Sequence, residues 1–75
     1  SKKYDVVEAN IVADVIIALS EQVPYYIKKQ GTFICSGIIK QREQDVKIAL
    51  EKNRFTIIDI KYKKDWVAIV SRYDG

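Results

Sequence analysis

Valine and isoleucine together account for twenty of the 75 residues, whereas leucine occurs only twice. β-Branched side chains pack well on a pleated surface, and runs of them are typical of strands with both faces buried. The bias therefore favours a sheet at the centre of the fold. A chain of this length forms at most one small domain, which buries only about 60% of the surface exposed by its unfolded state.

Strand and helix patterns alternate along the first thirty residues. Residues 5–9 are a short apolar run with polar neighbours, which predicts a strand. From residue 12 the apolar residues recur at spacings of three and four, which predicts a helix. Pro24 predicts a kink or restart in this helix, and Lys28 and Lys29 suit its end. The apolar stripe consists of Val12, Val15, Ile16, Leu19, Val23, Tyr26 and Ile27.

A second strand and a second helix follow. Residues 32–36 are a short apolar strand that ends at Gly37. Residues 40–53 predict a charged surface helix, closed by Asn53 because asparagine tolerates the left-handed angles of a helix end. The stripe that packs this helix consists of Ile39, Val46, Ala49 and Leu50.

The last third of the chain predicts an antiparallel hairpin. Residues 55–62 and 66–72 are strand-like and are joined by a short polar connection. The order is thus strand, helix, strand, helix, strand, strand. Two strand-helix-strand units give a parallel sheet, to which the hairpin adds one antiparallel strand. The predicted fold class is α/β.

The composition excludes several kinds of site. Cys35 is the only cysteine and histidine is absent, which excludes an internal disulfide, a zinc finger and triads that need imidazole. A formal charge of +3 is weaker than a dedicated nucleic-acid binder would show. No stretch approaches the roughly 20 apolar residues of a membrane span. Cys35 is expected to be a buried, inert thiol in a reducing, cytoplasmic compartment.

Ligands of open α/β sheets bind beyond the carboxyl ends of the strands. Such sheets commonly begin with a glycine-rich turn, but only Gly31, Gly37 and Gly75 occur here and they are far apart. We therefore expect residues 1–75 to be one partial domain, the C-terminal half of a doubly wound Rossmann-like sheet.

The segments at the strand ends resemble one family. In order and spacing they are similar to the C-terminal part of the PrmA methyltransferases, which methylate large-subunit ribosomal protein eleven. The resemblance runs from Tyr4 to Arg72. The segments that carry it are Glu8-Ala9-Asn10-Ile11-Val12-Ala13, Gly31-Thr32-Phe33-Ile34, Ser36-Gly37-Ile38 and Asp65-Trp66-Val67.

The resemblance implies a class I methyltransferase that uses S-adenosylmethionine to methylate amines of a ribosomal protein. This chain would supply strands four to seven of a seven-stranded sheet. The glycine-rich motif, the acidic ribose ligand and the substrate-recognition domain would lie upstream. We therefore expect the 75-residue chain by itself to be inactive and to bind no cofactor.

The resemblance also implies four binding residues. Asn10 would lie beside the methionine end of the cofactor and the target amine, and Ile11, Ser36 and Gly37 would line the substrate pocket. Three of the four have a structural alternative. Asn10 is a good N-cap for the following helix, and Ser36 and Gly37 suit a tight strand-to-helix turn.

Three further features bear on partners. Trp66 is expected in the core, although it could also close over a substrate. Lys61, Lys63 and Lys64 suggest an alternative function, a self-standing interaction module whose basic hairpin binds RNA or a protein, although RNA binding is not favoured. With its upstream neighbour absent, the edge between Asp5 and Ala9 is expected to be uncovered, which favours a homo-oligomer.

Overall fold

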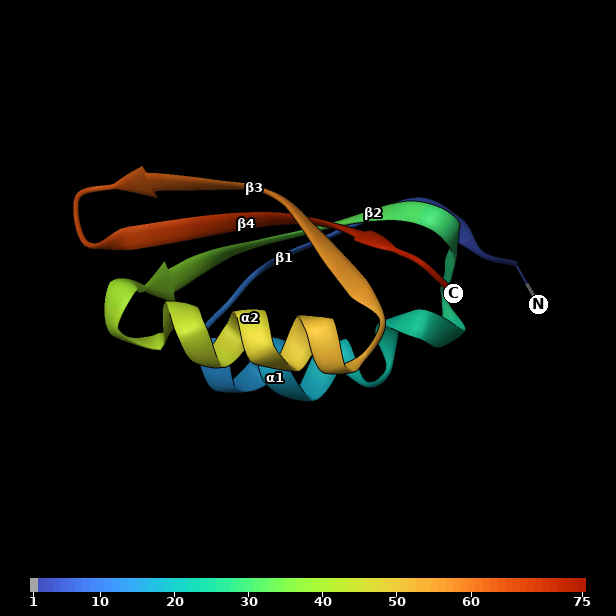
Figure 1. Ribbon diagram of the computed structural model, residues 1–75, viewed down its shortest axis with the longest axis horizontal. Helices are drawn as coiled ribbons and strands as arrows, with labels where there is room; N and C mark the ends of the chain where they lie inside the picture. Colours follow the sequence, from blue (N-terminus) through green and yellow to red (C-terminus); the bar gives the residue numbers. More distant parts are fainter. Residues whose placement is uncertain (1) are drawn as a thin grey trace.

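The computed structural model describes residues 2–75 and confirms the predicted order of strands and helices (Figure 1). Two short 3-10 helices, η1 and η2, are interposed. The elements are β1 (Tyr4–Asn10), α1 (Ala13–Ser20), η1 (Val23–Tyr25), β2 (Ile27–Ile39), η2 (Lys40–Arg42), α2 (Glu43–Lys52), β3 (Phe55–Lys63) and β4 (Trp66–Tyr73).

The four strands form one mixed sheet in the order β1-β2-β4-β3. β1 and β2 are parallel, and β4 runs antiparallel to both β2 and β3. The predicted sheet with one antiparallel strand is therefore confirmed. That strand, β4, lies inside the sheet, whereas β1 and β3 are its edges.

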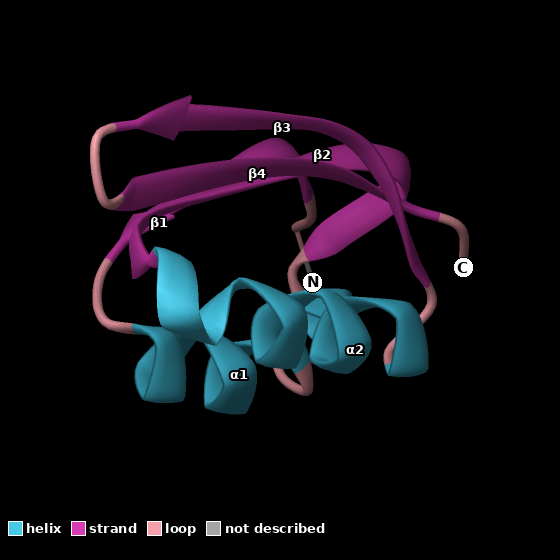
Figure 2. Ribbon diagram, turned by 60° about the vertical axis from the view of Figure 1, so that its left-hand side comes forward, coloured by secondary structure: helices cyan, strands magenta, loops and turns pink. Residues whose placement is uncertain are grey.

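Both α-helices lie on the same face of the sheet (Figure 2). Alternate strand residues point toward them and are fully buried, among them Phe33, Cys35 and Ile69. Ile16 of α1 and Leu50 of α2 complete this core from the other side. No helix among residues 2–75 covers the opposite face.

Cys35 lies in this core, as the sequence predicts. Burial raises the pKa of its thiol to about 12, because the apolar surroundings disfavour the thiolate. A thiolate is the reactive form of cysteine, so Cys35 is a packing residue.

The first helix is much shorter than predicted. α1 ends at Ser20, and helical structure restarts at Val23 as the 3-10 turn η1, in which Pro24 is the second residue. Lys28 and Lys29 belong to β2 rather than to a helix end. Proline at the start of η1 has no N–H to continue a helix, so the pattern breaks there. The expected stripe was therefore partly wrong.

The buried positions of α1 show the difference. Ala13, Ile16 and Ser20 are buried, whereas Val12 and Val15 are exposed. Tyr26 is also exposed, because it lies beyond the helix. The stripe joined residues of three separate elements into one apparent face.

The second strand and helix also depart from prediction. β2 does not end at Gly37 but passes through it to Ile39, which is exposed and does not belong to the stripe of α2. Asn53 does close α2, but with φ −98°, and the left-handed residue is the following Arg54, with φ 72°.

Candidate functional site

Parallel pairing of β1 and β2 brings the four predicted binding residues together. Asn10 is paired with Ser36, and the N–H of Ile11 donates a hydrogen bond of 3.2 Å to the carbonyl of Ser36. Gly37 follows at once along β2. β1 thus ends beside Ser36, three residues before the end of β2, and ligands of open α/β sheets bind near the carboxyl ends of the strands.

A β-bulge shapes β2 at this point. Cys35 pairs with Ile69 and Ile38 with Val67, so Ser36 and Gly37 together face the single residue Ala68. Gly37 has φ 79°, a left-handed conformation that glycine adopts without steric cost. The bulge interrupts the regular pairing of β2 with β4 beside the end of β1.

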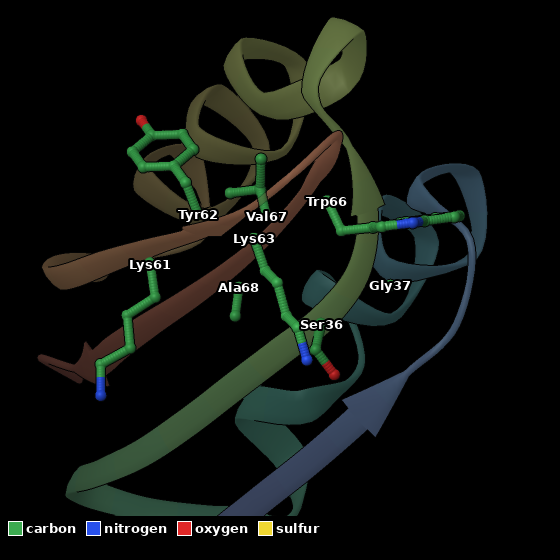
Figure 3. Close-up of a pocket in the computed structure, with 8 residues that line it drawn as sticks. All are labelled: Ser36, Gly37, Lys61, Tyr62, Lys63, Trp66, Val67 and Ala68. Atoms are coloured by element: carbon green, nitrogen blue, oxygen red, sulfur yellow. The ribbon is translucent and has the colours of Figure 1, made fainter.

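Two adjoining hollows lie at this bulge, and we call them together the strand-end groove. They measure about 440 and 470 Å³. Ser36, Gly37, Lys63 and Trp66 line both, and Asn10 lines the second with Lys64. Figure 3 shows the residues of the first hollow, with Trp66 extending across the end of β2 and Lys63 reaching toward Ser36.

Asn10 does not cap the following helix. The N-cap of α1 is Val12, and no side chain satisfies the N–H groups there. The structure records no hydrogen bond by the Asn10 carboxamide within residues 2–75. The capping alternative is therefore wrong, and the carboxamide can accept or donate a hydrogen bond in the groove.

Ser36 and Gly37 do not form a strand-to-helix turn, because β2 continues for two residues beyond them. Their structural alternative is thus replaced by the bulge. Both residues line the groove.

Trp66 is not a core residue. Its side chain is 53% exposed and forms a wall of the groove. The insertion of β4 beside β2 explains this position, since Trp66 pairs with Ile39 on one side and with Lys63 on the other. Sequence reasoning missed Lys63 as a lining residue, although its place opposite Trp66 in a short hairpin was a usable signal.

The hairpin gives the groove a positive border. Lys61 and Lys63 project from β3 and Lys64 from the turn, where it takes φ 54° in place of a glycine. On the neighbouring side, the Tyr62 hydroxyl donates a 2.7 Å hydrogen bond to Glu43, which raises the pKa of that phenol, with a smaller contribution from desolvation. None of the residues that line the groove is acidic.

The described part of the chain offers little for other chemistry. Residues 2–75 contain no group of three or more histidine, cysteine, aspartate or glutamate side chains placed to hold a metal ion. In the same residues, no helix has the length and apolar character needed to cross a bilayer.

The sequence matches the family model of ribosomal protein L11 methyltransferase (PrmA) over residues 1–74. It is 54% identical over 68 residues to the ribosomal protein L11 methyltransferase of Ruminiclostridium cellulolyticum, covering 91% of this chain and 22% of that protein. The protein of the same name from Acetivibrio thermocellus is 49% identical over 71 residues, covering 95% of this chain and 23% of that protein.

The fold has a solved counterpart. A ribosomal protein L11 methylase from Lactobacillus delbrueckii subsp. bulgaricus superposes with a TM-score of 0.90 and 27% identity, over 96% of this chain and 38% of that chain. The chain spans less than a quarter of the length of the two curated relatives from Ruminiclostridium cellulolyticum and Acetivibrio thermocellus.

Proposed function

Because the chain belongs to the ribosomal protein L11 methyltransferase family, we propose that it forms part of an enzyme that methylates amines of that ribosomal protein with S-adenosylmethionine. The single observation that supports this function most directly is the unengaged carboxamide of Asn10 at the strand-end groove. Membership of the family favours the enzyme over the self-standing interaction module.

Methylation of an amine depends mainly on placement. S-adenosylmethionine, when bound, supplies an electrophilic methyl group that forms a bond to the amine nitrogen while the methyl–sulfur bond breaks and its electron pair stays on sulfur. The acceptor must be a neutral amine, and the product ammonium releases its proton to solvent. The residues of the groove therefore need to hold and orient the acceptor rather than act as strong acids or bases.

Asn10 is suited to hold the acceptor. An amide oxygen accepts a hydrogen bond from an amine N–H and leaves the nitrogen lone pair free to point elsewhere. It stays neutral at every physiological pH, so it does not favour the protonated, unreactive form of the amine. We assign Asn10 to the target amine and to the methionine end of the cofactor.

The neighbouring residues form the substrate pocket in this proposal. Ile11, Ser36 and Gly37 provide its floor at the ends of β1 and β2, and Trp66 forms an apolar wall for the aliphatic part of an amine side chain. Lys63 and Lys64 border the pocket, and their positive charges disfavour the protonated, positively charged form of an acceptor amine there. Like charges lower the pKa of a nearby amine, which favours its neutral form.

The residues of this chain fit only part of the cofactor. The groove can take the methionine end, but residues 2–75 hold no glycine-rich loop for close backbone contacts with it. We propose that the isolated chain binds no S-adenosylmethionine. Titration calorimetry that gave a dissociation constant below about 100 μM would contradict this.

Three further proposals concern the chain as a whole. Residues 1–75 form one partial catalytic domain, and the protein acts in the cytoplasm, where ribosomal proteins are made. β1 pairs with a strand on one side only, so the isolated chain self-associates through the edge at residues 5–9.

The experiment is a methylation assay with a full-length enzyme that carries this sequence. The purified ribosomal protein and S-adenosylmethionine are the substrates, and intact-protein mass spectrometry detects added methyl groups. Methylated lysine or N-terminal amines are expected. Absence of any transfer from a folded enzyme would contradict the proposal.

A further inference from the structure

The carboxamide oxygen of Asn10 occupies the space in which a side chain on Gly37 would begin. A β-carbon built on Gly37 would lie 2.6 Å from Oδ1 of Asn10 and 3.4 Å from the backbone N and O of Ile11. Contacts below 3.0 Å are essentially never made by real β-carbons, so something would have to shift. The side chain of Asn10 is the part that can move.

Backbone conformation already favours glycine at this position, because a residue with a β-carbon is strained at φ 79°. Gln30, Arg54 and Lys64 also have positive φ, at 70°, 72° and 54°, and each carries a long side chain. The chain therefore tolerates a β-carbon in the left-handed region at three other places. Position 37 has, in addition to its φ of 79°, the oxygen of Asn10 in the place of a β-carbon.

The contact joins two strand ends that the sheet already aligns. Asn10 pairs with Ser36 across the parallel strands, and the bulge in β2 turns Gly37 toward the end of β1. Both residues line the hollow of about 470 Å³. A methyl group at position 37 would thus push the carboxamide within the site, not at a distant surface.

We propose that Gly37 is a positioning residue for Asn10, a role that rests on the proposed methyl transfer. The missing side chain lets the carboxamide oxygen lie against β2, and the close fit limits the rotamers that Asn10 can adopt. Without this fit, the accepted amine would be displaced from the line of transfer. A displacement of about 1 Å can lower a rate a hundredfold.

The test is a double-mutant cycle in the full-length enzyme, with Gly37→Ala, Asn10→Ala and the double variant. Gly37→Ala is expected to lower kcat about a hundredfold in the presence of Asn10 and less than about threefold when Asn10 is already alanine. Any rise in the KM for S-adenosylmethionine, whose methionine end Asn10 also contacts in the proposed function, should likewise appear only when Asn10 is present. Equal losses of kcat in both backgrounds would show a purely structural glycine and overturn the proposal.

Thermal unfolding of the same four proteins covers the case in which Gly37→Ala folds poorly. Gly37→Ala should lower Tm less in the Asn10→Ala background, because the oxygen that it meets is gone. Gln30→Ala compared with Gln30→Gly measures the effect of a β-carbon at φ 70° away from the groove. Equal Tm losses in both backgrounds, of the size seen at Gln30, would also overturn the proposal.

The proposed function and this inference fail in different ways. A folded wild-type enzyme that methylates no amine contradicts the proposed function, and the role of Gly37 in transfer falls with it. An active wild type whose cycle shows no coupling contradicts the inference alone.

Discussion

Nδ2 of Asn53 donates a hydrogen bond of 3.0 Å to Oγ of Ser20, which lies 33 residues earlier in the chain. The same Nδ2 donates 2.9 Å to the carbonyl of Ala49, and the buried Ser20 hydroxyl donates 2.6 Å to the carbonyl of Ile17. One amide group therefore closes the end of α2 and holds it against the end of α1.

Asn53→Ala should lower the free energy of unfolding of the 75-residue chain by about 1–3 kcal/mol, because it leaves the buried Ser20 hydroxyl without a donor. Urea unfolding measures the change. Glu51→Ala, at an exposed position of the same helix, is the control and should change stability by less than about 0.5 kcal/mol. Additive effects of Ser20→Ala and Asn53→Ala would show that the bond contributes nothing.

Trp66→Ala should impair substrate binding more than folding. Trp66 is 53% exposed, so truncation loses less buried area than at a core position, and it removes a wall of the groove. In the full-length enzyme, KM for the ribosomal protein should rise about tenfold or more, as for other aromatic contact residues. Ile58→Ala is the control, since Ile58 is 52% exposed and does not line the groove. A fall in Tm with unchanged KM would assign Trp66 to the fold alone.

Cys35 should make stability fall in alkaline solution. The folded state raises the thiol pKa from 9.0 to about 12, so only the unfolded chain loses this proton between those values. The contribution of the Cys35 thiol to the free energy of unfolding is therefore fully present below about pH 9. It decreases by at most about 1.4 kcal/mol per pH unit up to about pH 12. Urea unfolding at pH 8 and pH 10 measures the loss.

Cys35→Ala is the comparison for this loss, because it removes the thiol and leaves every other ionisable side chain in place. The variant should be less stable than the wild type at pH 8 and at pH 10, but its free energy of unfolding should change less between the two pH values. An equal pH dependence in both proteins would show that the thiol is not protected by burial.

The edge at β1 predicts self-association of the isolated chain. β1 and β3 are both edge strands and carry half-exposed residues, Val6 at 53% and Ile58 at 52%. Sedimentation equilibrium at tens of micromolar should show a dimer or larger assembly that Val6→Lys dissociates, since edge lysines oppose strand pairing. Ile58→Lys should leave it intact. A monomeric wild type would contradict the prediction, and dissociation by Ile58→Lys instead would place the interface at β3.

The spacing of apolar residues and the order of the resulting segments predict most of this fold, because strands and helices differ in that spacing. The first half of β2 escaped prediction because Lys28, Lys29 and Gln30 are polar and follow a helical pattern without interruption other than Pro24. Tyr26 and Ile27 fit the helical spacing of the apolar stripe that begins at Val12, although neither lies in α1. Local pattern does not show that a chain has left one element for another.

The candidate site also has a part that is predictable from the sequence and a part that is not. Two strands that a strand-helix-strand unit makes parallel carry Asn10, Ser36 and Gly37 near their carboxyl ends, and Ile11 follows the first of them, so the proximity of these residues is predictable from the sequence. Lys63 and Trp66 reach the groove only because β4 inserts between β2 and β3. The position of β4 between β2 and β3 is set by the pairing of all the strands, which no local sequence pattern shows. The expectation that a large aromatic is buried consequently misplaced Trp66.

The central claim is that Asn10 holds the acceptor amine, and Asn10→Ala in the full-length enzyme tests it most directly. Because Asn10 caps no helix, the variant should keep Tm within a few degrees while kcat falls about a hundredfold. Scanning calorimetry measures Tm, and steady-state methylation of the ribosomal protein measures kcat. Near-normal turnover by the folded variant would contradict the account.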